Sequence, residues 1–305
     1  MKTIKMYFQH TNKAYLPEIA AYRRYFEKTP QFNVVDSTEC PFKEAKDIDV
    51  VWRFMGVDTA PHSAFTIHEY GSLSTGFMAP LKDRIKKYIN TKPDMRIFLN
   101  TFVKEGFGFK DGVQQCIRDM GVDRSFFMTD KSKEYDFVYC GTITKERKVH
   151  LLIDKIARDM TGKKLLVIGS VPDDIYAAYK QYKNIVFTGK LDYMDVPRYA
   201  KKAMYGINCV PDIFPYYGQT STKVLEYCAL DLKIITFDGE WIRQFEKRHN
   251  AAFLRVKEDF SDFTMNKIEG YSYQIPNVSE YQWDNVIQKS GIREMILNDM
   301  QVRSA

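Results

Sequence analysis

The sequence lacks several features that mark whole classes of protein. It has only five cysteines in 305 residues, and no two of them form a CxxC pair. An odd, scattered set argues against a disulfide framework or a zinc site and predicts a reducing compartment. No run of 18 apolar residues is present, which argues against a membrane-spanning helix. The N-terminal stretch MKTIKMYFQHTNKAY holds no apolar segment of secretory length, so we expect a cytoplasmic protein.

A large excess of charge of one sign is also missing. The 45 Lys and Arg residues face 39 Asp and Glu residues, for a net charge of +6, which is well short of a dedicated nucleic-acid binder. The densest basic stretch contains Lys82, Arg84, Lys86 and Lys87. It is either a solvated helix face or a site of attraction to an anionic partner. That partner is an anionic acceptor or the inner membrane face, where attraction is worth roughly 1 kcal/mol per basic residue. Composition alone leaves both open.

What the sequence does contain is apolar material for two cores, at 45% hydrophobic residues. In the second half, short apolar runs alternate with amphipathic segments, a pattern typical of a parallel sheet with helices on both faces. The predicted strands are 137–140, 165–168, 185–187, 206–210, 234–237 and 252–254, and the predicted helices are 149–160, 173–182, 195–203, 222–230 and 240–249.

The first half shows the same alternation less regularly. The predicted strands are 3–8, 32–35, 50–54, 64–68, 96–100 and 125–128, the predicted helices are 15–27, 77–89 and 109–120, and the polar segment 128–135 reads as a linker. The fold class is therefore α/β, with two doubly wound Rossmann-like domains facing a cleft. In such sheets ligands bind outside the carboxyl ends of the strands, so the loops that follow strands are the candidates.

Two such loops in the second half carry groups suited to phosphate. Gly141 to Lys148 follows a strand and precedes a helix, and Arg147 adds positive charge beside the positive end of the helix dipole. The loop that ends at Gly218 leads into residues 219–222, whose hydroxyls suit the N-cap of a helix that carries Lys223 and Glu226. Amides, hydroxyls and Lys223 suit a diphosphate, and Glu226 suits a ribose diol. The alternative is a capped helix with an ordinary i,i+3 surface pair, worth about 0.2–0.5 kcal/mol.

The order of motifs in residues 135–240 resembles the donor domain of GT-B nucleotide-sugar glycosyltransferases, most closely the family-four (group one) class. The motifs are FVYCGTITKERKVHLLI, LLVIGS, NIVFTGKLDYMDVPRYAKKA and STKVLEYCALDLKII. The late segment YQWDNV is similar to the family's aromatic helix that packs back. The resemblance implies an N-terminal acceptor-side domain at 1–132, a nucleotide-sugar donor domain at 133–282 and a returning C-terminal helix at 283–305.

The resemblance also implies roles for individual residues. Arg147 takes the position of the cation on the donor diphosphate, Ser221, Thr222 and Lys223 hold the phosphates, and Glu226 binds the ribose. The remaining donor-binding positions are Gly141, Thr142, Gly189, Lys190, Leu191, Tyr217 and Gly218. The chain departs from the family in two places, because Gly141-Thr142 replaces the usual Gly-Arg pair and Gly218 stands where the first glutamate of a two-glutamate motif is expected.

The acceptor side offers fewer candidates. We expect the predicted strand 64–68 to end in a polar loop that starts at His68 and Glu69, either of which suits a catalytic base or hydrogen-bond partner. His10, after the first strand, is a weaker candidate of the same kind. A lone histidine at a strand end is also commonly structural, and this alternative stays open.

These observations predict a metal-independent glycosyltransferase, of the hexosyltransferase type, that moves a sugar from a nucleotide-diphosphate donor, with UDP expected, to a glycan or lipid-linked acceptor. The resemblance also implies that no metal or other cofactor is needed, because in such enzymes cations and a helix N-terminus neutralise the leaving diphosphate. The resemblance leans toward retention at the anomeric carbon. The alternatives are a sugar-nucleotide 2-epimerase on the same fold and a non-catalytic protein that binds a nucleotide sugar.

Overall fold

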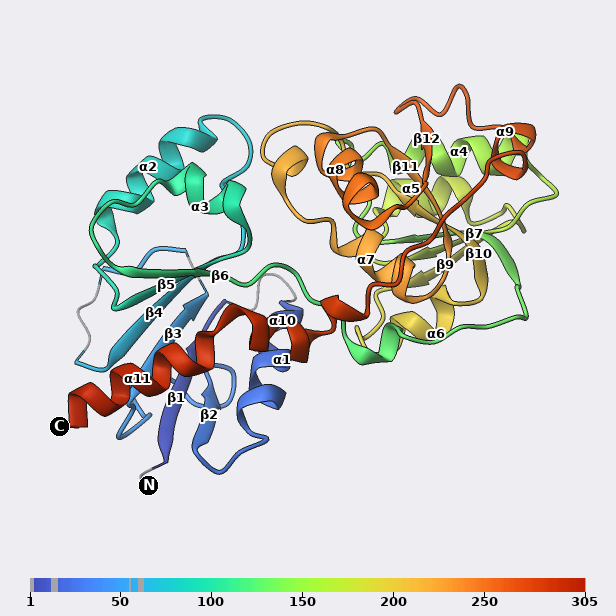
Figure 1. Ribbon diagram of the computed structural model, residues 1–305. Coiled ribbons are helices and arrows are strands. Elements are labelled where there is room, and N and C mark those ends of the chain that lie inside the picture. Colours follow the sequence, from blue (N-terminus) through green and yellow to red (C-terminus); the bar gives the residue numbers. More distant parts are fainter. Residues whose placement is uncertain (1–2, 12–15, 55, 60–62, 305) are drawn as a thin grey trace. The chain divides into compact units, whose positions relative to one another are not determined.

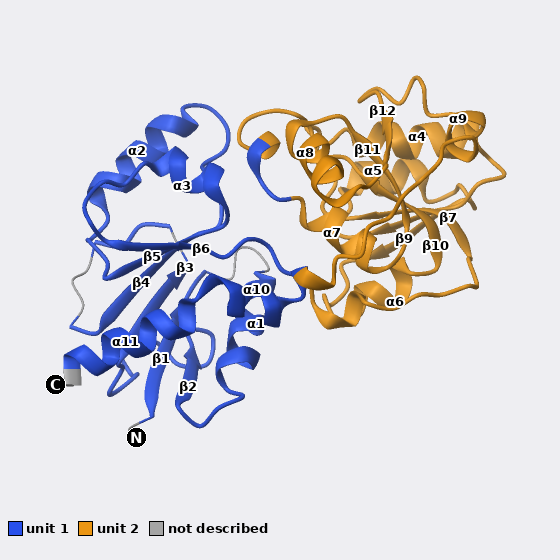
Figure 2. Cartoon of the chain, in the orientation of Figure 1, with its two compact units in different colours: residues 1–121, 218–220, 281–305 blue, residues 122–217, 221–280 orange. Residues whose placement is uncertain are grey.

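The computed structural model consists of two compact units (Figures 1 and 2). It describes residues 3–11, 16–54, 56–59 and 63–304. Unit 1 comprises Met1–Gly121, Gly218–Thr220 and Tyr281–Ala305, and unit 2 comprises Val122–Tyr217 and Ser221–Glu280. Both termini of the chain therefore belong to unit 1.

Unit 1 is built on a six-stranded parallel sheet with the order β2-β1-β3-β4-β5-β6. The strands are β1 (Ile4–Gln9), β2 (Phe32–Asp36), β3 (Val50–Phe54), β4 (Phe65–Tyr70), β5 (Met95–Phe98) and β6 (Gln114–Ile117). The helices that lie between these strands along the chain are α1 (Pro17–Phe26), α2 (Ala79–Ile89) and α3 (Thr101–Phe107). The strand order changes direction between β1 and β3, as in doubly wound sheets.

The end of the chain completes the core of unit 1. Helices α10 (Trp283–Ser290) and α11 (Ile292–Ser304), red in Figure 1, are separated by Gly291, whose φ is +69°. Trp283 is buried in the same core as β1 and α1. A Cβ at Gly121 would lie 2.3 Å from the Trp283 ring, so only glycine permits this close packing.

Unit 2 contains a second six-stranded parallel sheet, with the order β12-β11-β10-β7-β8-β9. Its strands are β7 (Tyr135–Cys140), β8 (Leu165–Ile168), β9 (Ile185–Gly189), β10 (Ala203–Asn208), β11 (Lys233–Phe237) and β12 (Leu254–Val256). Its helices are α4 (Val149–Asp159), α5 (Asp173–Tyr179), α6 (Val196–Ala200), α7 (Thr222–Ala229), α8 (Glu240–His249) and α9 (Met265–Glu269). If the strands are numbered from β7 as the first, their order is 6-5-4-1-2-3, which is that of a Rossmann sheet. The predicted fold class of two Rossmann-like domains is therefore confirmed.

Three local predictions are wrong, two of them in unit 1 and one at the start of unit 2. Residues 109–120 are not a helix but contain β6. Residues 125–128 are not a strand, because their first two residues belong to a 3-10 helix at Arg124–Phe126. Tertiary ion pairing explains the first error. Arg96 Nη1 and Nη2 each donate to a carboxylate oxygen of Asp111 at 2.7 Å, and this pairing holds the start of residues 109–120 as a loop. A local cap explains the second, because Asp123 accepts a hydrogen bond from the Ser125 amide at 2.9 Å. The third error is β4, which continues to Tyr70 instead of ending at His68.

Candidate functional site

The direction of the strand order in unit 2 reverses between β7 and β10, which are neighbours in the sheet. In doubly wound sheets this reversal separates the loops at the carboxyl edge and opens a binding crevice there. The loop after β7 contains Gly141 and Arg147, and the loop after β10 leads to α7 with Lys223. The two cationic candidates therefore follow the two strands that border the reversal, Arg147 in the loop after β7 and Lys223 in the first turn of α7.

Three glycines end three adjacent strands at this edge. Gly141, Gly169 and Gly189 follow or end β7, β8 and β9 with φ values of +143°, +140° and +70°. The backbone is closely packed, because a Cβ at Gly169 would lie 2.2 Å from the Gly141 carbonyl oxygen. The sequence had indicated Gly141 and Gly189 but not Gly169, whose need for glycine arises from a contact between two loops. The result is an edge of backbone groups without side chains.

Arg147 lies in the turn before α4, over the end of β7. Its Nη1 atom would be 3.2 Å from a Cβ at Gly141. Burial lowers the pKa of Arg147, but hydrogen bonding and charge interaction with the Tyr139 phenol outweigh that effect and raise it overall. The neighbouring Lys148 pairs with Glu258 at 2.7 Å, whereas no carboxylate among the described residues pairs with Arg147. A half-buried guanidinium without a counter-ion is suited to an anionic ligand.

Lys223 and Glu226 form a pair one turn apart on α7. Lys223 Nζ donates to Glu226 Oε2 at 2.7 Å, and the Tyr193 hydroxyl donates to Oε1 at 2.9 Å. The pair differs from the surface alternative, because the Glu226 side chain is 1% exposed and that of Lys223 is 29% exposed. Tyr193 was not among the predicted site residues, since only the fold brings it to α7.

Arg147 and Lys223 influence the same side chain. Burial raises the pKa of the Tyr139 phenol, and the charges of Arg147 and Lys223 both act to lower it. For Lys223 itself, burial lowers the pKa, but the Glu226 carboxylate outweighs burial, so the pKa is raised and the amine stays charged. One cation from the turn before α4 and one from the first turn of α7 therefore act on the same buried phenol.

Helix α7 starts at Thr222 as predicted, but the expected hydroxyl caps are absent. The Ser221 hydroxyl donates to Asn208 Oδ1 at 3.2 Å, and the Thr220 hydroxyl donates to Asp119 Oδ1 at 2.7 Å. No side chain caps the helix, because both hydroxyls serve tertiary contacts. Tyr227 holds α7 against the sheet through its hydroxyl, which accepts a hydrogen bond from the Cys140 amide at 3.0 Å.

The structure accounts for the glycine at position 218. Gly218 belongs to unit 1, and its carbonyl accepts a hydrogen bond from Asn100 Nδ2 at 2.9 Å. A Cβ at this position would lie 2.4 Å from the Phe102 ring. The glutamate of the family pattern is therefore incompatible with this packing unless Phe102 moves.

The remaining predicted donor-side residues lie around the same edge of unit 2. Thr142 and Lys190 are exposed, and Leu191 is half-buried in the loop after β9. Tyr217, in the 3-10 helix Tyr216–Gly218, is 36% exposed and packs edge-on against Phe214. Their roles stay predictions.

The expectation of an exposed loop at His68 and Glu69 is wrong, because both residues lie within β4 and are buried. His68 Nε2 lies 3.1 Å from Asp58 Oδ2. Glu69 accepts hydrogen bonds from Trp52 Nε1 at 2.8 Å and Arg118 Nε at 2.7 Å. Burial raises the pKa of Glu69, against the opposing charge of Arg118. We therefore assign both residues to the interior of unit 1.

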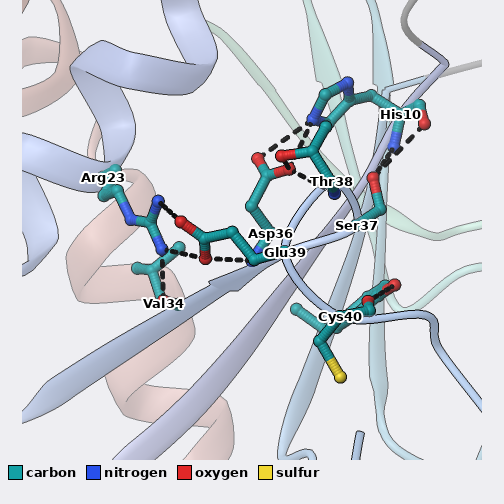
Figure 3. A network of polar contacts seen from close by, with 9 residues as sticks. His10, Arg23, Val34, Asp36, Ser37, Thr38, Glu39 and Cys40 are labelled. Carbon is teal, nitrogen blue, oxygen red and sulfur yellow. Dashed lines mark hydrogen bonds and ion pairs between the residues drawn. The ribbon is translucent and has the colours of Figure 1, made fainter. Parts of the chain in front are cut away.

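His10 has surroundings better suited to chemistry (Figure 3). It follows β1, and its Nε2 lies 3.0 Å from both carboxylate oxygens of Asp36, at the end of β2. The hydroxyl and amide of Thr38 also donate to Asp36, and these hydrogen bonds lower the pKa of Asp36 against the effect of burial. An ionised Asp36 selects the tautomer in which His10 Nε2 carries the proton. The sequence had made His10 the weaker candidate, and the carboxylate beside it comes from 26 residues away.

Within the described ranges, no group of three or more His, Cys, Asp or Glu side chains is arranged to hold a metal ion. All five cysteines are free. No helix in the described part of the chain is both long enough and apolar enough to cross a membrane.

Comparison with solved structures identifies the fold. No protein-family model and no curated protein sequence matches the chain. Among solved structures, HepE of Anabaena in complex with UDP-glucose superposes with a TM-score of 0.64 at 9% identity, over 99% of this chain and 100% of that one. AviGT4, a glycosyltransferase involved in avilamycin A biosynthesis, gives 0.60 at 12% identity, over 97% and 98%. A putative UDP-N-acetylglucosamine 2-epimerase from Listeria monocytogenes gives 0.58 at 12% identity, also over 97% and 98%. The chain thus has the GT-B fold of nucleotide-sugar glycosyltransferases.

Proposed function

We propose that the protein is a glycosyltransferase that uses a nucleotide-diphosphate sugar, with UDP as the nucleotide, to extend a glycan or lipid-linked acceptor. The observation that carries this proposal is the position of Arg147 beside the strand-order reversal of unit 2, where Lys223 also lies. Arg147 is half-buried, and no described carboxylate neutralises it. The structural similarity to HepE with bound UDP-glucose supports UDP as the nucleotide.

In this proposal the donor diphosphate binds between Arg147 and the start of α7. Arg147, Lys223 and the uncapped amides of α7 stabilise the negative charge that builds on the leaving diphosphate. Ser221 and Thr222 lie beside these amides, and the glycine edge allows the ligand to approach the backbone. We assign the ribose hydroxyls to Glu226, whose two carboxylate oxygens also accept hydrogen bonds from Lys223 and Tyr193.

The remaining donor contacts follow from the loops around this edge. Gly189 at the end of β9 and Lys190 and Leu191 after it contact the base, and Tyr217 lies beside the sugar. With this set of cations the reaction requires no metal ion. On the acceptor side, we assign to His10 the hydrogen bond with the acceptor hydroxyl that the sequence had assigned to His68 or Glu69, because Asp36 orients its imidazole.

The experiment that tests donor binding is a thermal-shift panel with UDP-, GDP-, ADP- and CMP-sugars. A ligand at a hundred times its Kd stabilises the native state by about 2.7 kcal/mol, or a shift of about 5–10 °C for a unit of this size. We expect the UDP-sugars to give this shift and Arg147→Ala or Lys223→Ala to abolish it. The matched control is Arg158→Ala, which removes an exposed cation on α4 and should keep the shift.

The turnover test offers the best UDP-sugar with glycan and lipid-linked acceptors and measures release of UDP. Release that depends on the acceptor supports the transferase. Donor binding without release under any acceptor favours a non-catalytic protein that binds nucleotide sugar. If none of the nucleotide sugars produces a thermal shift, the proposal as a whole is contradicted.

A second candidate function is a sugar-nucleotide 2-epimerase, and the similarity to the Listeria structure is the observation that favours it. Incubation with a UDP-sugar and no acceptor distinguishes the two. Appearance of an epimer supports the epimerase, whereas an unchanged sugar together with acceptor-dependent UDP release supports the transferase.

We also propose that the protein reaches a lipid-linked acceptor through peripheral contact with an anionic membrane. The basic stretch of Lys82, Arg84, Lys86 and Lys87 is the surface for this contact, and it lies on α2 of unit 1. Donor binding in unit 2 does not depend on it.

A further inference from the structure

Helix α2 exposes apolar side chains along one whole face. Among the described residues, six large apolar side chains with at least two-fifths of their surface exposed fall within residues 77–89. They are Phe77 at 88%, Tyr88 at 72%, Met78 at 49%, Ile85 at 47%, Ile89 at 44% and Leu81 at 42%. With 3.6 residues per turn, positions 81, 85, 88 and 89 lie on one side of the helix, and Met78 extends that side toward the N-terminus. We call these six residues the α2 apolar face.

The opposite side of α2 attaches the helix to unit 1. Ala79 and Asp83 are buried, and the Asp83 carboxylate accepts two hydrogen bonds from the Ser74 amide at 3.0 and 3.1 Å. Lys86 donates to the Ser74 hydroxyl at 2.9 Å, and Lys87 donates to the Gly108 carbonyl. The usual amphipathic arrangement is therefore reversed, with a polar anchor inside and apolar side chains outside.

The exposed charges of α2 itself have one sign. Lys82 and Arg84 are exposed on its two sides, and Lys86 and Lys87 are half-buried behind it. Asp83 is the one acidic residue of the helix, and it faces the interior. An apolar strip bordered by cations matches an anionic lipid surface, where the apolar side chains enter the acyl boundary and the cations meet phosphates.

The same charges argue against a second copy of the chain as the occupant. In a two-fold dimer the same patch would meet itself, which would bring the cations of one helix close to those of the other. Isolated apolar residues on a surface need no explanation, but a continuous strip of this kind marks an interaction site.

We infer that α2 is an in-plane membrane anchor: its apolar face, Phe77 and Tyr88 above all, inserts into the boundary of an anionic bilayer while Lys82 and Arg84 bind lipid headgroups. This inference deepens the peripheral contact proposed above, because it adds insertion to charge attraction, and it is independent of donor binding.

The experiment is vesicle flotation of the full chain with phosphatidylcholine alone and with phosphatidylglycerol added. We expect binding to the anionic vesicles, reduced about tenfold or more by Phe77→Ser or by Tyr88→Ser, since each removes a large apolar side chain from the bilayer. Arg84→Gln should weaken binding about fivefold, and this effect should shrink in high salt.

Two control variants isolate the face. Val302→Ser removes an apolar side chain that is 77% exposed outside α2, and Lys183→Gln removes an exposed cation of unit 2. Both should float like the wild type. The thermal shift with UDP-sugar should be the same in Phe77→Ser and the wild type, so that loss of membrane binding and loss of donor binding are told apart.

Three results would overturn the inference. They are no flotation of the wild type, equal flotation of wild type and Phe77→Ser, and a dimer in vesicle-free buffer that Phe77→Ser converts to monomer. The last of these would make a second copy the occupant of the α2 apolar face.

Discussion

Acidification should destabilise unit 1 through His68, which the structure places in the core. The side chain has no exposed surface, and Nδ1 has no hydrogen-bond partner in the described part of the chain. Protonation would place an unpaired N–H in the interior. Burial accordingly lowers the pKa of His68 to about 4, although the hydrogen bond to Asp58 acts in the opposite direction.

The magnitude follows from proton linkage. The pKa of His68 is about 4 in the folded protein and 6.5 in the unfolded chain, so the unfolded chain binds more protons between these values. The stabilisation is fully present above pH 6.5 and is lost as the pH falls toward the folded pKa. Between pH 7 and pH 5 the loss is about 2 kcal/mol of the free energy of unfolding.

The assay is urea unfolding at pH 7, 6 and 5, followed by tryptophan fluorescence, to which Trp52 and Trp283 in the core of unit 1 contribute. His68→Gln cannot titrate, so its stability should fall by about 2 kcal/mol less than that of the wild type over this range. His150→Gln, which makes the same substitution at a half-buried histidine of unit 2, serves as the comparison. Equal slopes for His68→Gln and wild type would refute the lowered pKa of His68 in the folded protein.

Three further predictions follow from the packing and from the proposed chemistry. Gly169→Ala should lower the free energy of unfolding, measured in urea, by about 2–4 kcal/mol, because its Cβ would meet the Gly141 carbonyl oxygen. Gly162→Ala, with open space around it, should change the free energy of unfolding by less than about 0.5 kcal/mol. Similar values for both variants would contradict the close packing of the glycine edge. Trp283→Ala should cost about 3–5 kcal/mol in the same assay, and a small loss would mean that the C-terminal helices contribute little to the core of unit 1. Chelation with EDTA should leave UDP release unchanged, and a loss restored by added Mg²⁺ would disprove the metal-independent proposal.

Much of the architecture could be predicted from the sequence because its signals are local. The strand Leu165–Ile168 is a continuous apolar run, and α8 shows a clear helical period, so both were predicted with their observed bounds. The start of α7 at Thr222 was also predicted, since the loop before it contains proline and glycine. Edge elements were harder, because β6 is short and only half-buried, and its loop is fixed by the pairing of Arg96 with Asp111.

The candidate site divides in the same way. Gly141, Arg147, Lys223 and Glu226 were identified because glycine and cations at strand and helix ends are visible in one short stretch. Tyr193 was missed because it approaches Glu226 from 33 residues away. The exposed loop expected at His68 and Glu69 was an error of the same origin, since a polar residue in a strand gives no local sign of whether a partner is buried beside it.

The sequence by itself determined two parallel sheets, their helices and the segments that carry the cations. Hydrophobic periodicity and the glycine and proline residues that end elements can be recognised within a few residues. Tertiary structure alone decided which polar residues are buried and paired, why glycine is required at positions 121, 169 and 218, and that α2 turns its apolar side outward. These properties depend on which atoms from distant segments come into contact, and no short stretch of sequence contains that information.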